Sequence, residues 1–373
     1  MIIRKNFKYL LKPNKTSEAL FHQFAGARRW IYNWGLQQRK ETFEKEEKKV
    51  SLFDQNNALV FLKQKTTWLS SIHSQVLQQA LSDLDKAYVS FFLGLKKGPK
   101  VGYPRFKCKG VRDSFRYPQG VKVEEDRVFL PKIGWVKWIK SREIEGVIKQ
   151  TTILKEGEKW YISFSCEIEN FSSPKIDLNP KKFVGIDLGL THFATMAIGD
   201  KNHLVTIENP KFLKKSLEKL RFLSRNLSRK MKKGKNRYKA RKKLSQFHFH
   251  LRNLRLDFCN KLVLQIVKNH DIIGIEKMNI LHMVQGLKTL ARAINDAGWG
   301  LFLSCLKNKA IEYGKTLHEV SSFLGNTKLC SNCGQKNEME LGQRTYKCSC
   351  GHNLDRDLNA AINIKNQAVG ASV

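Results

Sequence analysis

Acidic residues are scarce in this chain, and long hydrophobic segments are absent. Its 373 residues include 33 Asp and Glu against 68 Lys and Arg, a formal net charge of +35 at pH 7. Solubility alone needs a net charge of only about 2–8 in a small domain. The excess therefore indicates a polyanionic partner, and nucleic acid is the usual one. The 41% of hydrophobic residues excludes a wholly disordered basic tail.

Membrane-spanning and export signals are also missing. No apolar run reaches the roughly 18 residues of a transmembrane helix, and residues 1–8 hold no long apolar stretch of the kind found in secretory signals. We therefore expect a protein of the cell interior, with no membrane partner and no disulfides. Internal repeats and low-complexity tracts are absent as well, so the length predicts two or three ordinary domains.

The first half of the chain predicts a multidomain α+β protein. Residues 1–14 read as a strand, 15–97 as helices with Ser17 as a plausible N-cap, and 121–169 alternate with period two, which is typical of antiparallel strands. We interpret 1–14 and 98–180 as one small β-barrel and 15–97 as a helical insertion in it. A linker rich in Ser, Asn and Pro is expected at 171–180.

The second half has an α/β pattern. Short buried strands are predicted at 183–187, 192–198 and 271–276. Helices are predicted in 211–270, joined near Gly234, and at 289–313 and 356–367.

Cations concentrate in two places. Residues 211–250 carry 16 Lys and Arg but one acid, and aromatic and basic residues interleave in 103–117. Such patterns favour phosphate tracking and base stacking, although a solvated helix face or an edge strand with extended Lys and Arg side chains would look similar. The candidate nucleic-acid contacts are Arg28, Arg105, Lys107, Arg229, Lys232, Lys233, Arg237, Arg241 and Arg344.

Four cysteines lie close together near the C-terminus: Cys330 and Cys333, then Cys348 and Cys350. Two short turns that each carry two thiolates are typical of a tetrahedral zinc site. Four protein ligands leave no open position, so the one Zn²⁺ would be structural. His352 is an alternative ligand, because the second pair is one residue shorter than the common spacing.

Carboxylates end two predicted buried strands, Asp187 and Glu276, and Asp355 and Asp357 open the last helix. Three such acids at one sheet edge could hold two Mg²⁺ ions for phosphodiester hydrolysis. Each acid alone has a simpler interpretation, Glu276 as an ion-pair partner and Asp355 as an N-cap. Helical spacing does not decide between Asp355 and Asp357.

At these residues the chain resembles the transposon-encoded TnpB proteins, which are related to compact type V CRISPR effectors. The resemblance extends along nearly the whole chain and is carried by the following segments: Arg28-Arg-Trp-Ile-Tyr-Asn33, Pro104-Arg-Phe-Lys107, Gly185-Ile-Asp-Leu-Gly189, Gly274-Ile-Glu276, Cys330-Ser-Asn-Cys-Gly334 and Cys350-Gly-His-Asn-Leu-Asp-Arg-Asp-Leu-Asn-Ala-Ala-Ile-Asn363.

This resemblance implies an RNase H-like RuvC nuclease domain at 181–373, with a zinc ribbon at 326–352. It also implies that the barrel is a wedge domain carrying a helical recognition insertion. The family triad falls on Asp187, Glu276 and Asp357. The implied partners are a guide RNA from the transposon end and a double-stranded DNA target cut beside a short motif. We expect a monomer in the prokaryotic cytoplasm, at the nucleoid.

Three other functions stay open at this point. The chain could be a nuclease-inactive RNA-guided DNA-binding regulator, a DNA transposase with a similar fold, or a CRISPR-associated effector of the same ancestry. The presence of all three acids argues against the first. The sequence does not separate an effector from a transposon-borne nuclease.

Overall fold

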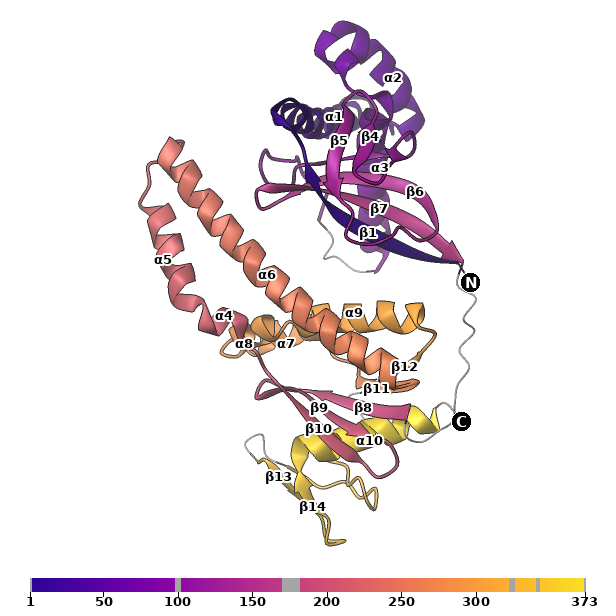
Figure 1. The fold of residues 1–373 in the computed structure, drawn as a ribbon, viewed down its shortest axis with the longest axis vertical. Coiled ribbons are helices and arrows are strands. Elements are labelled where there is room, and N and C mark those ends of the chain that lie inside the picture. The colour runs from indigo at the N-terminus through magenta and orange to yellow at the C-terminus, as the bar shows by residue number, and fades with distance from the viewer. Residues whose placement is uncertain (1, 98–101, 170–181, 322–325, 340–342, 372–373) are drawn as a thin grey trace. The chain divides into compact units, whose positions relative to one another are not determined.

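The chain forms two compact units, Met1–Glu169 and Asn170–Val373, each taken by itself below (Figure 1). The computed structural model describes residues 2–97, 102–169, 182–321, 326–339 and 343–371, so the whole of the expected linker at 171–180 lies outside the described residues. Within these ranges no helix is both long and apolar enough to cross a membrane.

A seven-stranded antiparallel sheet forms the base of the first unit. Its strands are β1 (Ile2–Lys12), β2 (Ser114–Tyr117), β3 (Lys122–Val123), β4 (Arg127–Leu130), β5 (Gly134–Ile139), β6 (Val147–Glu156) and β7 (Lys159–Glu169). They lie in the order β2-β6-β7-β1-β5-β4-β3. The N-terminal strand is therefore central, between β7 and β5. Among the described residues no pairing joins β2 to β3, so closure into a barrel stays a prediction.

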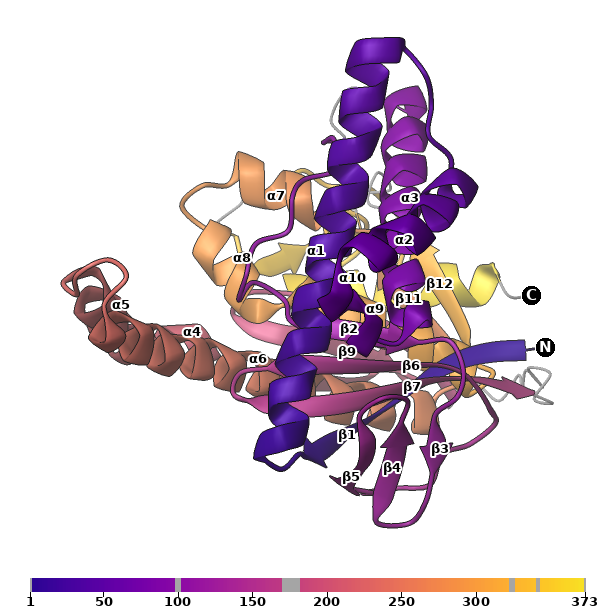
Figure 2. The same ribbon diagram turned by 90° about the horizontal axis from the view of Figure 1, so that it is seen from above.

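Helices cover this sheet and share its core. They are α1 (Lys15–Glu46), α2 (Leu52–Lys65), a short 3₁₀ turn (Thr67–Ser71) and α3 (Ser74–Lys97). Helices α1 and α3 pack together (Figure 2). Phe21 of α1 packs edge-on against Trp160 of β7, with ring centroids 5.1 Å apart, so helices and sheet form one hydrophobic core. The expected N-cap was wrong: Asn14 caps α1 by accepting from the Ser17 amide, 2.7 Å away.

The second unit is built on a five-stranded mixed sheet. Its strands are β8 (Phe183–Leu188), β9 (His192–Ile198), β10 (His203–Glu208), β11 (Ile272–Glu276) and β12 (Thr316–Val320). They lie in the order β10-β9-β8-β11-β12. The first three are antiparallel neighbours, and β11 runs parallel to both β8 and β12. Because β8 and β11 are parallel neighbours, their carboxyl ends meet at one edge of the sheet.

Helices lie on both faces of this sheet. They are α4 (Phe212–Lys215), α5 (Leu217–Ser228), α6 (Lys235–Asn269), α7 (Ile280–Gly286), α8 (Ala291–Ala297), α9 (Trp299–Glu312) and α10 (Arg356–Gly370). The helix expected at 289–313 is instead two helices, since Gly298 adopts a left-handed φ of 74° between α8 and α9. The turn before α6 falls at Gly234, as predicted. Helices α5 and α6 form a hairpin that projects beyond the sheet (Figure 1).

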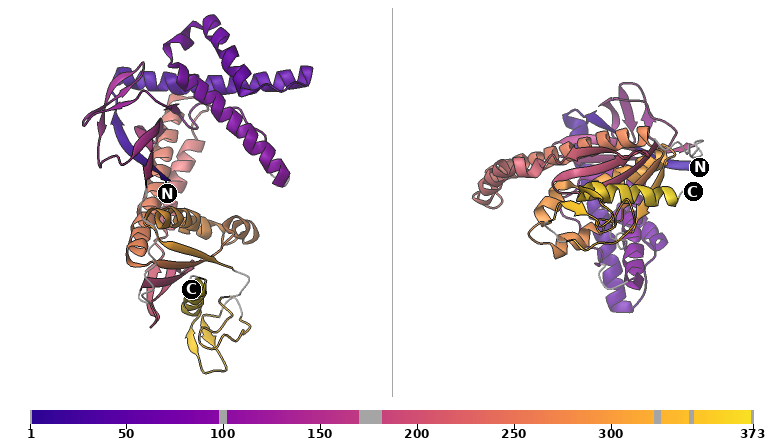
Figure 3. Two further views of the ribbon diagram at one scale, coloured as in Figure 1. Left: turned by 90° about the vertical axis from the view of Figure 1, so that its right-hand side faces the viewer. Right: turned by 90° about the horizontal axis from the view of Figure 1, so that it is seen from below.

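Helix α10 lies directly against the backbone of the two central strands. A Cβ atom at Gly185 would come within 2.2 Å of the Ala361 carbonyl oxygen, and one at Gly274 within 2.8 Å of the Ile364 carbonyl oxygen. Glycine at these two positions is therefore what allows α10 to approach so closely. Two short strands, β13 (Thr345–Lys347) and β14 (Asn353–Asp355), lead into α10 and lie beside its first turns (Figure 3).

Candidate functional site

Three carboxylates meet in one pocket of the second unit. Asp187 and Glu276 each follow paired positions, Ile186 and Ile275, on the parallel strands β8 and β11. Asp357 reaches them from the first turn of α10. All three line a pocket of about 580 Å³, called the acid pocket below. The structure thus brings together the three acids named from the sequence.

The acid pocket is electrostatically unfavourable for its own carboxylates. Burial raises the pKa of Asp187 well above its ordinary value of 3.8, and the nearby Asp357 and Glu276 raise it further. Burial also raises the pKa of Glu276, although a bond from Asn326 opposes this. Partly buried acids that repel one another are stabilised by a bound cation. Carboxylate oxygens are the ligands that Mg²⁺ prefers, so the donor set fits this ion.

Asp355 has a different task from Asp357. Its Oδ1 accepts hydrogen bonds from the backbone amides of Asp357 and Leu358, at 2.9 and 3.3 Å. It is therefore the N-cap of α10 and does not line the acid pocket. Capping fixes the start of the helix and hence the position of Asp357.

Two arginines border the acid pocket. Arg344 donates to Thr191 Oγ1 at 3.1 Å and lies 3.5 Å from Asp357 Oδ2, with its side chain 58% exposed. Arg356 lies 3.4 Å from Asp357 Oδ1. Of the cations named from the sequence, Arg344 is the one at this pocket. Its exposure leaves it accessible to an incoming anion.

The four C-terminal cysteines form a second group, called the cysteine cluster below. Their Sγ atoms all lie within 4.8 Å of one another. The Cys330–Cys350 and Cys333–Cys348 distances are 3.7 and 3.6 Å, close to the separation of about 3.8 Å that four thiolates have around tetrahedral zinc. The Cys350 backbone amide lowers the pKa of Cys348, which favours its thiolate, whereas burial and the other three cysteines raise the pKa of Cys333.

The alternative ligand, His352, lies outside this cluster. Its Nε2 faces the hydroxyl of Ser331 at 3.0 Å. The cysteines alone therefore supply the four ligand atoms that fit a zinc ion.

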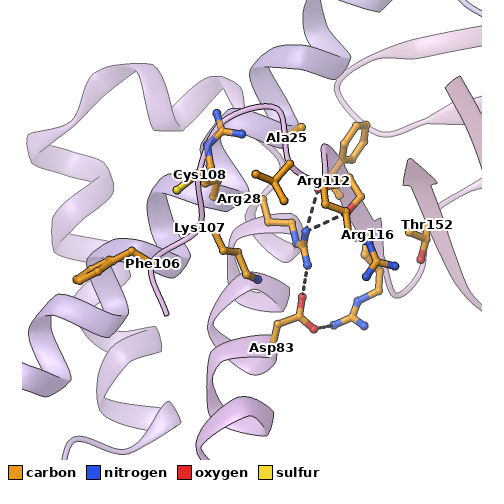
Figure 4. Close-up of a pocket in the computed structure, with 13 residues that line it drawn as sticks. Ala25, Arg28, Asp83, Phe106, Lys107, Cys108, Arg112, Arg116 and Thr152 are labelled. Atoms are coloured by element: carbon orange, nitrogen blue, oxygen red, sulfur yellow. Dashed lines mark hydrogen bonds and ion pairs between the residues drawn. The ribbon is translucent and has the colours of Figure 1, made fainter. Parts of the chain in front are cut away.

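The cations predicted in the first unit differ in their surroundings. Arg28 is held by Asp83 at 2.6 Å and by the hydroxyl of Ser114 at 3.0 Å. Lys107 lines the same pocket as Arg28 (Figure 4). Arg105 is exposed and does not line this pocket.

The predicted cations of the α5–α6 hairpin lie at its tip. Arg229, Lys232 and Lys233 are exposed in the turn between the helices. Arg237 has a structural role, since it donates to the carbonyls of Leu227 and Lys230 and so holds the turn. Arg241 lies near Tyr238.

A further cationic pocket adjoins the acid pocket and combines two cations of the basic run 211–250 with two that sequence reasoning missed, Lys288 and Arg292. It has a volume of about 460 Å³, and Leu190 lines both pockets. Four cations line it: Lys211, Lys214, Lys288 and Arg292. The acid in this pocket, Asp296, already accepts hydrogen bonds from backbone amides of α4 and forms an ion pair with Arg255. The cations come as two pairs, Lys211 with Lys214 and Lys288 with Arg292, which lie far from each other in sequence, and no motif links the pairs.

Comparison with known proteins places this geometry in a family. Residues 163–286 match the OrfB_IS605 family model, described as a probable transposase, and 299–364 match a model described as a Cas12f1-like TNB domain. Residues 1–48 match a helix-turn-helix model, although they form β1 and the single long helix α1 in this structure.

Relatives that match along most of their length show the family to which this chain belongs. The chain is 34% identical to the "Putative RNA-guided DNA endonuclease InsQ" of Escherichia coli K12, over 96% of this chain and 90% of the relative. A "Putative RNA-guided DNA endonuclease" of Streptomyces pristinaespiralis is 31% identical, over 99% and 90%. This chain belongs to the TnpB family.

The fold of this TnpB-family chain is also similar to a solved structure. "Structure of the mini-RNA-guided endonuclease CRISPR-Cas_phi3" aligns with a TM-score of 0.50 at 10% identity, over 98% of this chain and 92% of that one. At this identity the likeness concerns the fold alone.

Asparagines connect the cysteine cluster to the acid pocket, which the sequence did not reveal. Asn359 on α10 accepts from the Ser331 amide at 2.9 Å and donates to the Leu329 carbonyl at 2.7 Å. Asn363, one turn later, donates to the carbonyls of Asn326 and Leu329. The Asn326 amide nitrogen in turn lies 3.5 Å from Glu276. Asn359 stands in the quoted Asp-Arg-Asp-Leu-Asn motif, which was the available signal.

Proposed function

We propose that this TnpB-family chain is an RNA-guided, Mg²⁺-dependent DNA endonuclease with Asp187, Glu276 and Asp357 as its metal-binding acids. The observation that carries the proposal is the convergence of these acids in one pocket from β8, β11 and α10. The names of the E. coli and Streptomyces relatives support the RNA-guided activity.

The chain's own groups have distinct tasks in this proposal. The three carboxylates would hold two Mg²⁺ ions, which together supply activation of the attacking water and stabilisation of the leaving oxygen. Arg344, exposed at the rim, would bind a phosphate oxygen of the strand to be cut. Asp355 would act through α10, by keeping Asp357 in place.

The neighbouring cations favour a strand that enters beside the acids. Lys211, Lys214, Lys288 and Arg292 surround a pocket that shares Leu190 with the acid pocket. We propose that they contact phosphates next to the scissile one, since exposed Lys and Arg position a backbone without reading its sequence.

We also propose the domain assignment given above: a wedge barrel at 1–14 and 98–180, a recognition insertion at 15–97, and a RuvC-like domain at 181–373 that includes a zinc ribbon at 326–352. The mixed sheet with its acids at one edge supports the nuclease domain. The cysteine geometry supports one structural Zn²⁺. Cutting beside a short DNA motif, with a guide from the transposon end, completes the proposal.

The test compares a substitution near the carboxyl end of β8, at Asp187, with one at the start of α10, at Asp355. Full-length protein expressed with its genomic flanks should co-purify with a discrete RNA and cut matching plasmid DNA in the presence of Mg²⁺. Asp187→Asn should abolish cutting while the RNA stays bound. Asp355→Asn retains a good N-cap and should cut at close to the wild-type rate.

Cleavage by Asp187→Asn at the wild-type rate would refute the acid assignment, and preparations without any bound RNA would refute guidance. Sequencing the RNA separates the transposon nuclease from a CRISPR-associated effector, because repeat-derived and transposon-end RNAs differ.

A further inference from the structure

A basic pocket in the first unit holds more positive charge than its surroundings neutralise. It has a volume of about 610 Å³ and lies between α1, α3, β2 and the segment before β2 (Figure 4). Five cations and one acid line it: Arg28, Arg29, Lys107, Arg112, Arg116 and Asp83.

Part of this positive charge is neutralised by ion pairs within the protein. Asp83 lies between the guanidinium groups of Arg28 and Arg116, each 2.6 Å away (Figure 4). Arg29 pairs with Asp113 at 3.1 Å. These contacts alone would explain a structural ion-pair network.

The other part is not satisfied. Within the ranges that the structure describes, no ion pair joins Lys107 or Arg112 to a carboxylate. The buried Nε atoms of Arg28 and Arg116 also have no hydrogen-bond partner. The unpaired charge of the half-buried Lys107 and the unpaired buried N–H groups are costly unless a ligand completes them, whereas Arg112 is exposed and accessible to a bound anion.

Lys107 is held in this position by its neighbours. Its backbone N–H and C=O bond the side chain of Asn33 on α1, at 2.8 and 3.0 Å, and its ammonium lies 3.5 Å from the centre of the Tyr32 ring. Burial, followed by the charge of Arg28, lowers the pKa of Lys107 to about 8. The pocket is therefore pre-formed, with its cations facing one another.

We propose that this pocket binds one phosphate of single-stranded nucleic acid, with the attached nucleotide's base lying against Phe106. Phosphate oxygens accept from arginine N–H groups in pairs and from a lysine at one point, which matches the unpaired donors. Phe106 lines the pocket and is 45% exposed, so its ring is available for stacking. The proposal rests on the RNA-guided nuclease function, and guide RNA and unpaired DNA offer the same chemistry.

Cys108 provides a local probe of occupancy, because it is an exposed thiol that lines the pocket. The experiment measures the alkylation rate of Cys108 by iodoacetamide in the full chain, expressed without its genomic flanks and freed of RNA, by mass spectrometry, with and without a ten-nucleotide single-stranded RNA or DNA. Each protein is compared with itself, so that changes in thiol reactivity cancel.

Wild-type protein should show at least fivefold slower alkylation of Cys108 with an oligonucleotide present. In the Lys107→Gln, Arg112→Gln double variant the protection should fall below twofold. The matched control, Lys109→Gln with Lys122→Gln, removes the same charge outside the pocket and should keep full protection. Protection by RNA alone, by DNA alone or by both would support the pocket and identify the source of the phosphate.

Equal protection in the double variant and the wild type would overturn the proposal, as would absence of protection in the wild type. Thermal unfolding supplies a second readout. The double variant should melt no lower than the wild type, since it removes charges that repel Arg28 and Arg116, and a lower melting temperature would indicate a structural role. A chain that protects Cys108 but cuts no DNA would refute the proposed nuclease and leave this pocket standing.

Discussion

The cysteine cluster and the acid pocket share the segment from Cys348 to Asp357, yet the chain assembles them in different ways. The cysteine cluster gathers four ligands from two turns about 20 residues apart in sequence. The acid pocket gathers three from strands and a helix separated by more than 80 residues each. Local geometry builds the first, whereas the packing of a whole sheet builds the second. The Asn359 bonds join the two, so a change at these bonds should reach the acid pocket to a measurable extent, while each site keeps its own ligands.

The largest expected effect is the loss of DNA cleavage when one acid of the acid pocket is replaced. Glu276→Gln keeps the size of the side chain but removes one carboxylate from the proposed metal site, and metal stabilisation of a transition state is worth several kcal/mol. We expect DNA cleavage to fall about 10³-fold, with zinc content unchanged. Rates measured on the RNA-bound protein, together with zinc analysis, check this. Loss of zinc in this variant would mean that the two sites are not separable.

Removal of a cysteine should instead damage the cysteine cluster, with loss of zinc as the first effect. Cys333→Ser should lose the bound zinc, because three ligands hold the ion much more weakly than four. The segment from 326 to 355 has little core of its own, so it should become sensitive to protease. Cys108→Ser, a cysteine outside the cluster, serves as control and should retain one zinc per chain. If Cys333→Ser kept both zinc and protease resistance, the structural assignment of the cysteine cluster would be wrong.

A smaller effect is expected where the two regions meet. Asn359→Ala leaves the Ser331 amide without its partner, at a cost of about 1–3 kcal/mol for a buried group, and removes one of the two hydrogen bonds to the Leu329 carbonyl, which keeps the bond from Asn363. Cleavage should drop about tenfold while zinc stays bound. Asn366→Ala, at an exposed position of the same helix, should behave as wild type. Wild-type cleavage by Asn359→Ala would show that the cysteine cluster and the acid pocket act independently.

The smallest effect is on the stability of the metal-free protein. The pKa of Asp187 is raised in the folded state, so this group stabilises the fold most below its ordinary pKa of 3.8 and loses that contribution as pH rises through the folded value. Asp187→Asn removes the repulsion. At pH 7 the variant should therefore melt about 2–4 °C above the wild type, equivalent to about 1 kcal/mol. The difference should shrink toward pH 4.

Addition of Mg²⁺ should make the wild type melt at a higher temperature than Asp187→Asn, since only the wild type retains the full set of acids to bind the ion. Identical melting of the two metal-free proteins at pH 7 would contradict the electrostatic description of the acid pocket. Scanning calorimetry at several pH values, with EDTA and then with Mg²⁺, makes the comparison.

Much of the fold was predictable because its signals are local. The alternation of Trp160, Ile162, Phe164 and Cys166 predicted one buried strand face, and all four are buried. The strands that carry Asp187 and Glu276 were also found at the expected positions. The break at Gly298 was missed, because apolar residues continue across it and only its backbone conformation divides α8 from α9.

The sequence by itself determined the excess of positive charge, the spacing of the cysteines and the family motifs, since each is a property of neighbouring residues. The tertiary structure decided which acid caps α10 and which one enters the pocket, since that depends on the direction of a helix packed on Gly185 and Gly274. It also decided which cations are paired. Arg28 and Lys107 look alike in the sequence, but packing forms an ion pair between Arg28 and Asp83, and among the described residues it forms none with Lys107.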